Sequence, residues 1–379
     1  METYLRDLMV SLSRSGIKNS ALVHQSAISF TSLDETYESS GLSLPIVRAA
    51  VWMRLLFTPI SPAFPYLLNR LIKREKPDIL HIHTPNISAF WALFLPGARR
   101  IPWVIQWQSD VLASEHHWGL QLFYKIYRPF ERAMLKRAKV IIASSPTYLA
   151  SSLPLQEFSE KCVVIPLGLD PSTLAATSSV DTTTTPNQQH SSCLRVLAIG
   201  RLTYYKGFDY LIQAVARMDD IQLDLVGQGD EDTHLRALTK KLGADDKVCF
   251  HGHLSSDDLA RQFTRCDCVC LPSIERTEAF GLVLLEAMYF GKATIASDVP
   301  GSGMGWIVDQ GVTGLKTTPG NVDELLGALQ LLQQNRDKID TLGKNGSKKF
   351  DQYFHINRSS EQIARLYQRV LYDNRALPE

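Results

Sequence analysis

Two glutamates in the second half of the chain have the type and spacing to act on a ligand. Glu278 and Glu286 flank a Phe280-Gly281 step, with seven residues between them. Residues 266–273, CDCVCLPS, alternate and favour β structure, which predicts a buried strand just before this stretch. A loop acid followed by a solvated helix acid would be an equally good interpretation of these residues taken alone.

A helix is predicted to follow the Phe280-Gly281 step. Leu282, Leu285 and Met288 recur at helical spacing, and Gly291 is well placed to cap the helix end. Glu278 is therefore expected on the loop at the carboxyl end of a strand, and Glu286 early in the next helix. In open α/β sheets ligands bind in that crevice, and a helix N-terminus favours an anion there.

A second stretch supplies two cations in the same kind of position. Residues 200–208, GRLTYYKGF, follow a predicted strand at 194–199 and precede a predicted helix at 209–218. This order places Arg201 and Lys206 on another loop at a strand's carboxyl end. The two stretches together indicate an anionic ligand bound between them.

The pair of stretches, in this order, resembles the C-terminal half of a family 4 retaining glycosyltransferase of the GT-B fold. The resemblance implies that Arg201 and Lys206 hold the diphosphate of a nucleotide-sugar, that Glu278 contacts the donor sugar, and that Glu286 binds the ribose hydroxyls. It also implies a place beside the nucleobase for His253, which follows His251-Gly252. Further residues implied in donor binding are Gly200, Phe280, Gly281 and Leu282.

In the first half, Trp107-Gln108-Ser109-Asp110 resembles a family segment that usually reads Trp-His-Ser-Asp. The family histidine commonly reaches the reacting sugar or the acceptor, which implies a catalytic place for Gln108 and an acceptor-side place for Asp110. A glutamine can donate and accept hydrogen bonds but cannot titrate. His83, at the end of a predicted strand, could lie nearby, although a buried, hydrogen-bonded structural histidine is the favoured interpretation.

The length of 379 residues exceeds one ordinary core and predicts two domains. Apolar content of 45% with 21% charged residues is typical of a globular protein. We expect an N-terminal Rossmann-like domain at 1–170, a Ser/Thr/Pro-rich linker at 171–193, a nucleotide-sugar domain at 194–357, and a helix at 358–379 that crosses back to the first domain. Two such α/β domains would face each other across a cleft.

Strands alternate with helices throughout both predicted domains, which favours parallel sheets covered on both faces. In the first domain we expect strands at 21–24, 78–83, 102–107, 140–143 and 162–165, and helices at 1–15 and 117–136. In the second domain we expect strands at 194–199, 223–226, 248–250, 268–271, 294–297 and 315–317, and helices at 209–218, 232–242, 257–264 and 322–334.

The chain opens directly in a helix, whereas a Rossmann-type half begins with a strand that lies in the middle of the sheet. In the family, this helix is preceded by that strand and by a Gly-Gly loop that ends in x-Glu. Met1-Glu2 matches this x-Glu pair. We therefore expect the usual first strand to be encoded upstream of the given sequence.

Charge is unevenly spread although the net charge is +1. Residues 50–140 carry roughly eight more Lys and Arg than Asp and Glu. Two interpretations of this excess are equally good. The charges could lie on solvated helix faces, or they could attract anionic lipids or a phosphate-bearing acceptor. The basic, apolar segment 47–76 is the predicted membrane-docking surface, and nucleic acid is not expected, because no binding motif accompanies the charge.

Six cysteines occur without a signal peptide, which indicates a reducing cytoplasm. Cys266, Cys268 and Cys270 alternate along one predicted strand and are expected to point to one face as buried thiols. They lack C-x-x-C spacing, and the chain shows no convincing D-x-D or other metal ligand set, so no metal site and no cofactor are predicted. No apolar run is long enough for a transmembrane helix.

The resemblance implies a retaining, metal-independent hexosyltransferase that uses a nucleotide diphosphate sugar and a glycan or lipid-linked acceptor in cell-surface polysaccharide or glycolipid synthesis. It would act in the cytoplasm, with peripheral contact to the inner membrane face. Two carboxylates could also serve a glycoside hydrolase, but such an enzyme has no need of the Arg201 and Lys206 loop. The remaining alternatives are another GT-B activity, such as a sugar-nucleotide epimerase or a phosphorylase, and a catalytically silent binding protein.

Overall fold

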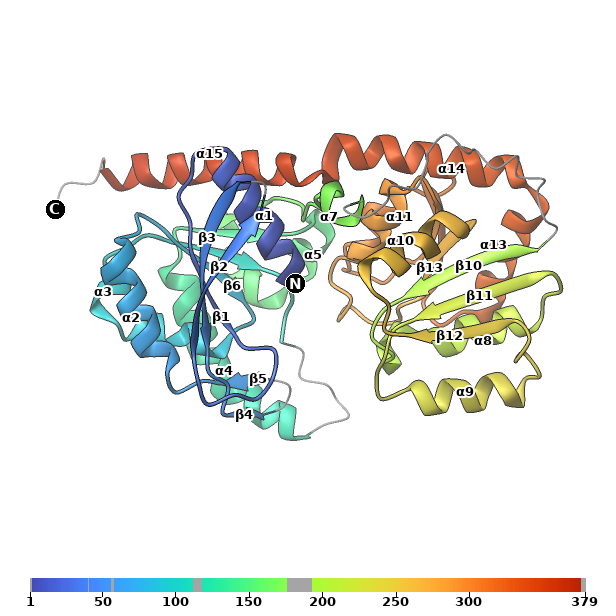
Figure 1. Ribbon diagram of the computed structural model, residues 1–379, viewed down its shortest axis with the longest axis horizontal. Coiled ribbons are helices and arrows are strands. Elements are labelled where there is room, and N and C mark those ends of the chain that lie inside the picture. The colour runs from blue at the N-terminus through green and yellow to red at the C-terminus, as the bar shows by residue number, and fades with distance from the viewer. Residues whose placement is uncertain (1, 40, 56–57, 112–117, 176–192, 376–379) are drawn as a thin grey trace. The chain divides into compact units, whose positions relative to one another are not determined.

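The chain folds into two compact units, which are described separately (Figure 1). The computed structural model describes residues 2–39, 41–55, 58–111, 118–175 and 193–375. Met1–Pro166 and Ile356–Glu379 make up the N-terminal unit, and Leu167–His355 the C-terminal unit. Most of the expected linker, residues 176–192, lies outside the described residues, and its described beginning is a short helix, α7 (Pro171–Ala175).

The C-terminal unit is built on a six-stranded parallel sheet with the order β12-β11-β10-β13-β14-β15. Its strands are β10 (Leu194–Ile199), β11 (Ile221–Val226), β12 (Val248–Gly252), β13 (Cys268–Leu271), β14 (Ala293–Ser297) and β15 (Gly314–Thr317). All six were predicted, with boundaries within two residues of the observed ones. The chain runs outward from β10 to β12 and then resumes at β13 on the other side of β10, so the topological switch point lies between β10 and β13.

Helices bury both faces of this sheet, as the near-continuous apolar strands predict. In β10, Val196 and Ala198 belong to the large cluster with Leu211 and Leu329, whereas Leu197 joins the opposite cluster with Phe263. The helices of the unit are α8 (Phe208–Ala216), α9 (Asp232–Lys241), α10 (Ser256–Arg265), α11 (Leu282–Tyr289), α12 (Met304–Ile307), α13 (Val322–Gln334) and α14 (Arg336–Lys349), followed by a π-helical turn at Phe350–Phe354.

The three alternating cysteines are buried, as predicted, but the prediction that they share one face is wrong. Cys268 and Cys270 pack in the large cluster, while Cys266 packs with Phe263 on the opposite side. The reason is that β13 begins only at Cys268, and Cys266 is still the C-terminal cap of α10. The period-2 pattern of the sequence therefore extends beyond the strand itself.

In the N-terminal unit, four parallel strands follow one another in chain order. They are β6 (Leu80–Thr84), β7 (Trp103–Trp107), β8 (Val140–Ala143) and β9 (Cys162–Val164), close to the predicted positions. A separate sheet has the order β1-β3-β2, in which β1 (Ala21–His24) lies parallel to β3 (Leu42–Ala49) and β2 (Leu33–Ser39) lies antiparallel to it. Among the described strands, these two sheets share no pairing.

The segment 47–76 contains the end of β3, a hairpin of β4 (Met53–Leu55) and β5 (Thr58–Ile60), and helix α2 (Phe64–Glu75). The apolar side of α2 is used inside the unit, because Phe64, Leu67 and Leu71 pack against Val47 and Ala49. Strands β2 to β5 were not predicted. Among the described residues of this segment, the exposed large apolar side chains are Trp52 and Met53 near β4 and Tyr66 on α2.

The other helices of the N-terminal unit are α1 (Glu2–Arg14), α3 (Pro96–Arg99), α4 (Trp118–Arg137), α5 (Pro146–Ser151), α6 (Leu153–Gln156) and α15 (Ile356–Arg375), with 3₁₀ turns at Ile87–Leu93 and Ser159–Lys161. Helix α15 packs on α1, where the Ser11 and Ser360 hydroxyls lie 2.7 Å apart. Across the described ranges, no helix combines the length and apolar content needed to cross a membrane.

Candidate functional site

The loop that carries Lys206 begins where β10 ends and closes in the 3₁₀ turn η3 (Tyr204–Lys206). Lys206 folds back over Gly200, since a Cβ atom at Gly200 would lie 3.0 Å from the lysine Cε. A side chain at position 200 would therefore displace the end of the Lys206 side chain from the start of the loop. Gly207 adopts φ +66° and caps this turn before α8 begins.

The Lys206 loop lies directly against the loop that follows β13. A Cβ atom at Gly207 would come within 2.3 Å of the Pro272 carbonyl oxygen, so only glycine permits this approach. The Ile274 N–H donates to the Tyr205 carbonyl at 2.8 Å, and the Tyr204 hydroxyl donates to Glu275 at 2.9 Å. The switch point between β10 and β13 thus brings the two predicted loops together.

Lys206 and Glu278 form an ion pair at this junction. Their side chains are only 12% and 14% exposed, so the pair is largely withdrawn from water. Two opposite charges in such surroundings attract more strongly than a surface pair. Arg201, by contrast, is exposed on the same loop.

Helix α11 (Leu282–Tyr289) begins shortly after Glu278, at the end of the Phe280-Gly281-Leu282 step. Gly281 caps the helix with φ +88°, and a Cβ atom there would lie 3.0 Å from Leu271. Phe280 is buried, and its ring makes a T-shaped contact with that of Phe354. The N-terminus of α11, with its partial positive charge, therefore lies in the same loop as the ion pair.

Glu286 lies one turn further along α11 than Leu282 and is half-buried. Burial raises the pKa of its carboxyl to about 7. The group therefore titrates near neutral pH, which is unusual for a glutamate and is typical of functional positions. Glu286 lies on α11 and Glu278 on the loop that leads into it, so the two predicted acids lie on consecutive segments of the chain.

The Gly227-Gln228-Gly229 turn after β11 supports the Gly200 loop from behind. A Cβ atom at Gly227 would lie 1.8 Å from the Gly200 carbonyl oxygen, and one at Gly229 would lie 2.2 Å from that of Leu202. The Gly227 N–H also donates to the Gly252 carbonyl at 2.8 Å. His253, which follows Gly252 at the end of β12, is exposed.

The residues predicted in the first half lie together at the carboxyl end of β7, in the N-terminal unit. The Gln108 side-chain amide donates to Nδ1 of His83 at 3.0 Å, and the Gln108 N–H donates to the Thr84 carbonyl. Burial lowers the pKa of His83 to about 4, so its ring is neutral near pH 7. His83 is therefore partly buried and hydrogen-bonded, and it lies beside Gln108, so its position agrees with both interpretations made from the sequence.

Asp110 is engaged by three neighbours. Its carboxylate accepts hydrogen bonds from the Trp107 indole at 2.8 Å and from the Ser152 hydroxyl at 2.6 Å. Its own N–H donates to the Tyr148 hydroxyl at 2.6 Å. These bonds fix the loop that carries Gln108, so Asp110 orients the loop whatever else it contacts.

Two groups of residues were missed in the sequence. Glu131 on α4 is buried, and burial followed by the charge of Asp110 raises the pKa of its carboxyl to about 7. Asp224, Cys249 and His251 form a cluster on β11 and β12. The alternation of Cys249 and His251 along one strand was a visible signal, but the approach of Asp224 depends on the pairing of the two strands.

Comparison with known proteins gives the same result in both halves of the chain. Residues 187–349 match the family described as glycosyl transferases group 1, and residues 1–168 match a glycosyl transferase 4-like domain. The O-antigen chain mannosyltransferase C of Escherichia coli is 27% identical over 85% of this chain and 84% of its own. A phosphatidyl-myo-inositol mannosyltransferase of Mycobacterium leprae is 28% identical over 89% of this chain and 85% of its own.

Among solved structures, the sucrose-phosphate synthase of Thermosynechococcus elongatus superposes with a TM-score of 0.78 and 23% identity. The match covers 98% of this chain and 93% of the synthase. At that identity the likeness concerns the fold, which is GT-B.

Proposed function

Because this chain belongs to the group 1 glycosyltransferases, we propose that it transfers a hexose from a nucleotide diphosphate sugar with retention of the anomeric configuration and without a metal ion at the reacting centre. The observation that carries the proposal is the meeting of Lys206, Glu278 and the N-terminus of α11 at one junction. At this junction Lys206 can bind the diphosphate, and the neighbouring carboxylate of Glu278 can bind the sugar.

The charges of this junction fit a departing diphosphate. When the bond between sugar and phosphate breaks, negative charge accumulates on the leaving group. Lys206, Arg201 and the N–H groups that begin α11 can stabilise this charge without rearranging, which is the largest contribution to catalysis in many enzymes. These positive groups do the work that a divalent cation would do elsewhere, which supports metal-independent transfer.

The two glutamates bind different parts of the donor. Glu278, next to Lys206, accepts hydrogen bonds from hydroxyls of the sugar, and Glu286, one turn into α11, accepts those of the ribose. Carboxylates make strong charge-assisted hydrogen bonds with hydroxyl donors. Gly200, Phe280, Gly281 and Leu282 shape the backbone around the diphosphate, and His253 lies beside the nucleobase.

The acceptor is a glycan or a lipid-linked saccharide in the synthesis of a cell-surface polysaccharide or glycolipid. The names of the relatives support this assignment, since one acts on O-antigen chains and another on phosphatidyl-myo-inositol. Gln108, held by His83, contributes a hydrogen bond rather than a proton to the reaction, because an amide does not titrate. Asp110 keeps this loop in place.

A panel of radiolabelled nucleotide-sugars tests the proposal directly. The protein is incubated with each donor, with and without lipid-linked acceptors and with excess chelator. We expect slow donor hydrolysis with one donor, transfer when the right acceptor is added, a retained anomeric configuration by NMR, and no loss of rate with chelator. Interconversion of donor sugars would indicate an epimerase instead, and binding without turnover a silent binding protein.

Peripheral contact with the inner membrane face is the second part of the proposal. Phe30 and Trp52 lie with ring centroids 6.1 Å apart, Met53 follows, and all three side chains are at least half exposed. Exposed aromatic residues beside a basic region are typical of membrane-surface binding, which needs both apolar area and cationic attraction. Within the predicted docking segment 47–76, we assign the contact to Trp52 and Met53, with Phe30 beside them.

Vesicle co-sedimentation tests the membrane contact. Binding should require anionic lipid, weaken with salt, and fall in a Trp52→Ser, Met53→Ser double variant. Leu153→Ser, which removes an even more exposed apolar side chain on α6, is the control and should bind normally. Binding that ignores lipid charge, or that survives the double variant, would rule out this patch.

A further inference from the structure

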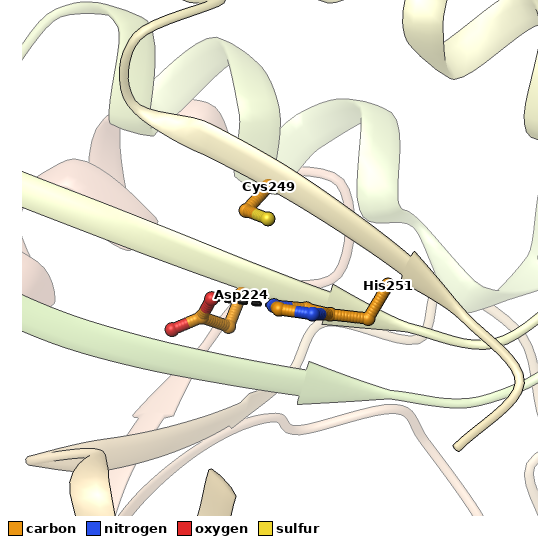
Figure 2. Close-up of side chains that lie close together, drawn as sticks. All are labelled: Asp224, Cys249 and His251. Carbon is orange, nitrogen blue, oxygen red and sulfur yellow. Dashed lines mark hydrogen bonds and ion pairs between the residues drawn. The ribbon is translucent and has the colours of Figure 1, made fainter.

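Three potential metal ligands project from the outer edge of the C-terminal sheet. Asp224 on β11 is the register partner of Cys249 on β12, the edge strand, and His251 follows Cys249 by two residues. Side chains two residues apart on a strand point to the same face. Figure 2 shows the carboxylate, the sulfur and the imidazole turned toward one another.

Their spacing is close to what a tetrahedral ion requires. The candidate ligand atoms of the three residues all lie within 4.8 Å of one another, and His251 Nε2 lies 2.6 Å from Asp224 Oδ1. Zinc with bonds of about 2.0–2.3 Å separates its ligand atoms by roughly 3.3–3.8 Å. The 2.6 Å separation is shorter than this spacing and the 4.8 Å limit is longer, so the three atoms need only small side-chain adjustments to reach ligand positions.

The ligand types select a particular class of ion. A thiolate with an imidazole favours zinc and similar borderline transition metals, whereas calcium and magnesium prefer oxygen ligands only. Cys249 is exposed, and the side chains of Asp224 and His251 are each 21% exposed, so an ion and a fourth, water ligand can enter from solvent.

A zinc-class ion would bind the thiolate form of Cys249, so its binding would release the thiol proton to solvent. The thiolate and the carboxylate of Asp224 would together balance the charge of a divalent ion.

We propose that Asp224, Cys249 and His251 bind a single zinc-class transition-metal ion that has no part in sugar transfer. Such an ion would fasten the edge strand β12 to β11. Gly252, next to His251, accepts the hydrogen bond from Gly227, which in turn supports the Gly200 loop. The ion would therefore stiffen the strand end that holds the donor loop in place.

Cobalt(II) is the probe that tests this proposal, because its absorption reports both ligand type and geometry. Titration of the reduced, metal-free, full-length protein should produce a thiolate-to-cobalt charge-transfer band and the intense visible bands of a tetrahedral site, and one equivalent of zinc should abolish both. Cys249→Ser should lose the charge-transfer band. His251→Asn should weaken cobalt binding at least about 100-fold, more than the loss of an outer-shell partner costs.

Two matched substitutions control for adventitious binding by other thiols and imidazoles. Cys193→Ser and His234→Ala remove a partly exposed cysteine and an exposed histidine elsewhere in the same unit and should leave the titration unchanged. Zinc should also raise the melting temperature of the wild-type protein and of these controls, but not of Cys249→Ser. A cobalt spectrum without the charge-transfer band, or one that Cys249→Ser retains, would overturn the proposal.

Discussion

Lys206 and Glu278, 72 positions apart in the chain, form an ion pair where the loops after β10 and β13 meet. Each charge thus has its partner while the site holds no donor. A diphosphate must compete with Glu278 for the lysine, and a sugar must compete with Lys206 for the carboxylate. Binding of the donor therefore exchanges one internal ion pair for two contacts with the ligand.

Glu278→Gln should separate nucleotide binding from sugar binding. Loss of the carboxylate charge frees Lys206, so a free nucleoside diphosphate should bind at least as tightly as to the wild type, with a gain of up to about tenfold, or about 1.4 kcal/mol. The nucleotide-sugar should lose this advantage, because its sugar contact is weakened. Calorimetry with both ligands measures the two effects.

The matched variant is Lys206→Met, which keeps the length of the side chain and removes its charge. It should weaken both ligands alike, by about 1.5–3 kcal/mol, since a charge-assisted hydrogen bond to phosphate is lost. Equal losses for the two ligands in Glu278→Gln would contradict the assignment of this glutamate to the sugar.

Nucleotide binding should gain strength as pH rises through neutrality. Burial raises the pKa of Glu286 to about 7, so this carboxyl is mostly protonated at pH 6 and mostly ionised at pH 8. Only the ionised form offers both oxygens as acceptors to the ribose hydroxyls. The phosphates of the nucleotide also titrate in this range, but their effect is the same for wild type and Glu286→Gln. The difference in affinity between the two proteins should therefore report on Glu286 alone, and it should grow between about pH 6 and pH 8. A difference that stays constant over that range would exclude Glu286 as the titrating group.

The N-terminal unit should lose stability in mild acid because of His83. Burial lowers the pKa of His83 to about 4, whereas an exposed histidine in the unfolded chain titrates near 6.5. The neutral ring therefore stabilises the fold fully above about pH 6.5, and this contribution is lost as pH falls toward 4, by up to about 3 kcal/mol.

Hydrogen exchange of the β6 and β7 amides, measured between pH 7 and pH 4.5, reports on this unit alone. The loss of protection on acidification, after correction for intrinsic exchange rates, should shrink in His83→Gln. His234→Gln, on α9 of the other unit, should leave it unchanged. An unaltered pH profile in His83→Gln would show that other groups cause the acid sensitivity.

Gly227→Ala should destabilise the C-terminal unit far more than a change at another glycine with positive φ. Its Cβ atom would lie 1.8 Å from the Gly200 carbonyl oxygen, so a loop must move, and we expect a loss of more than about 3 kcal/mol. Gly243→Ala, at φ +63° with nothing within 4 Å of the new Cβ, should lose only about 1–2 kcal/mol. Urea unfolding compares the two, and similar losses would mean that backbone conformation, not contact, determines the cost.

The parallel sheet of the C-terminal unit could be predicted because its strands are apolar on both faces and bounded by helices with clear periodicity. The β2 strand could not, because most of its residues are exposed and present no contrast between faces. The hairpin of β4 and β5 has strands of only three residues each, too short to show a period. The alternation of apolar and polar residues therefore does not predict strands that bury few side chains.

The candidate site was predictable as two loops but not as a set of contacts. The order of strands places the loops side by side, yet the Lys206–Glu278 pair depends on Gly207 lying against Pro272, which a one-dimensional pattern does not contain. The cluster of Asp224, Cys249 and His251 was missed for the same reason. Strand register, which the sequence does not specify on a polar edge, brings these residues together.

The contact of Gly227 with Gly200 has a consequence for protein engineering. The backbones of these two turns touch without any side chain between them. Their conformations are therefore coupled, although they lie in separate segments of the chain. A Gly200 loop taken from a relative must leave the same close approach to Gly227, and any change in its backbone path would meet the Gly227 turn. Chimeras of this enzyme should inherit residues 199–207 and 226–230 from the same parent, so that any recombination point falls outside both segments.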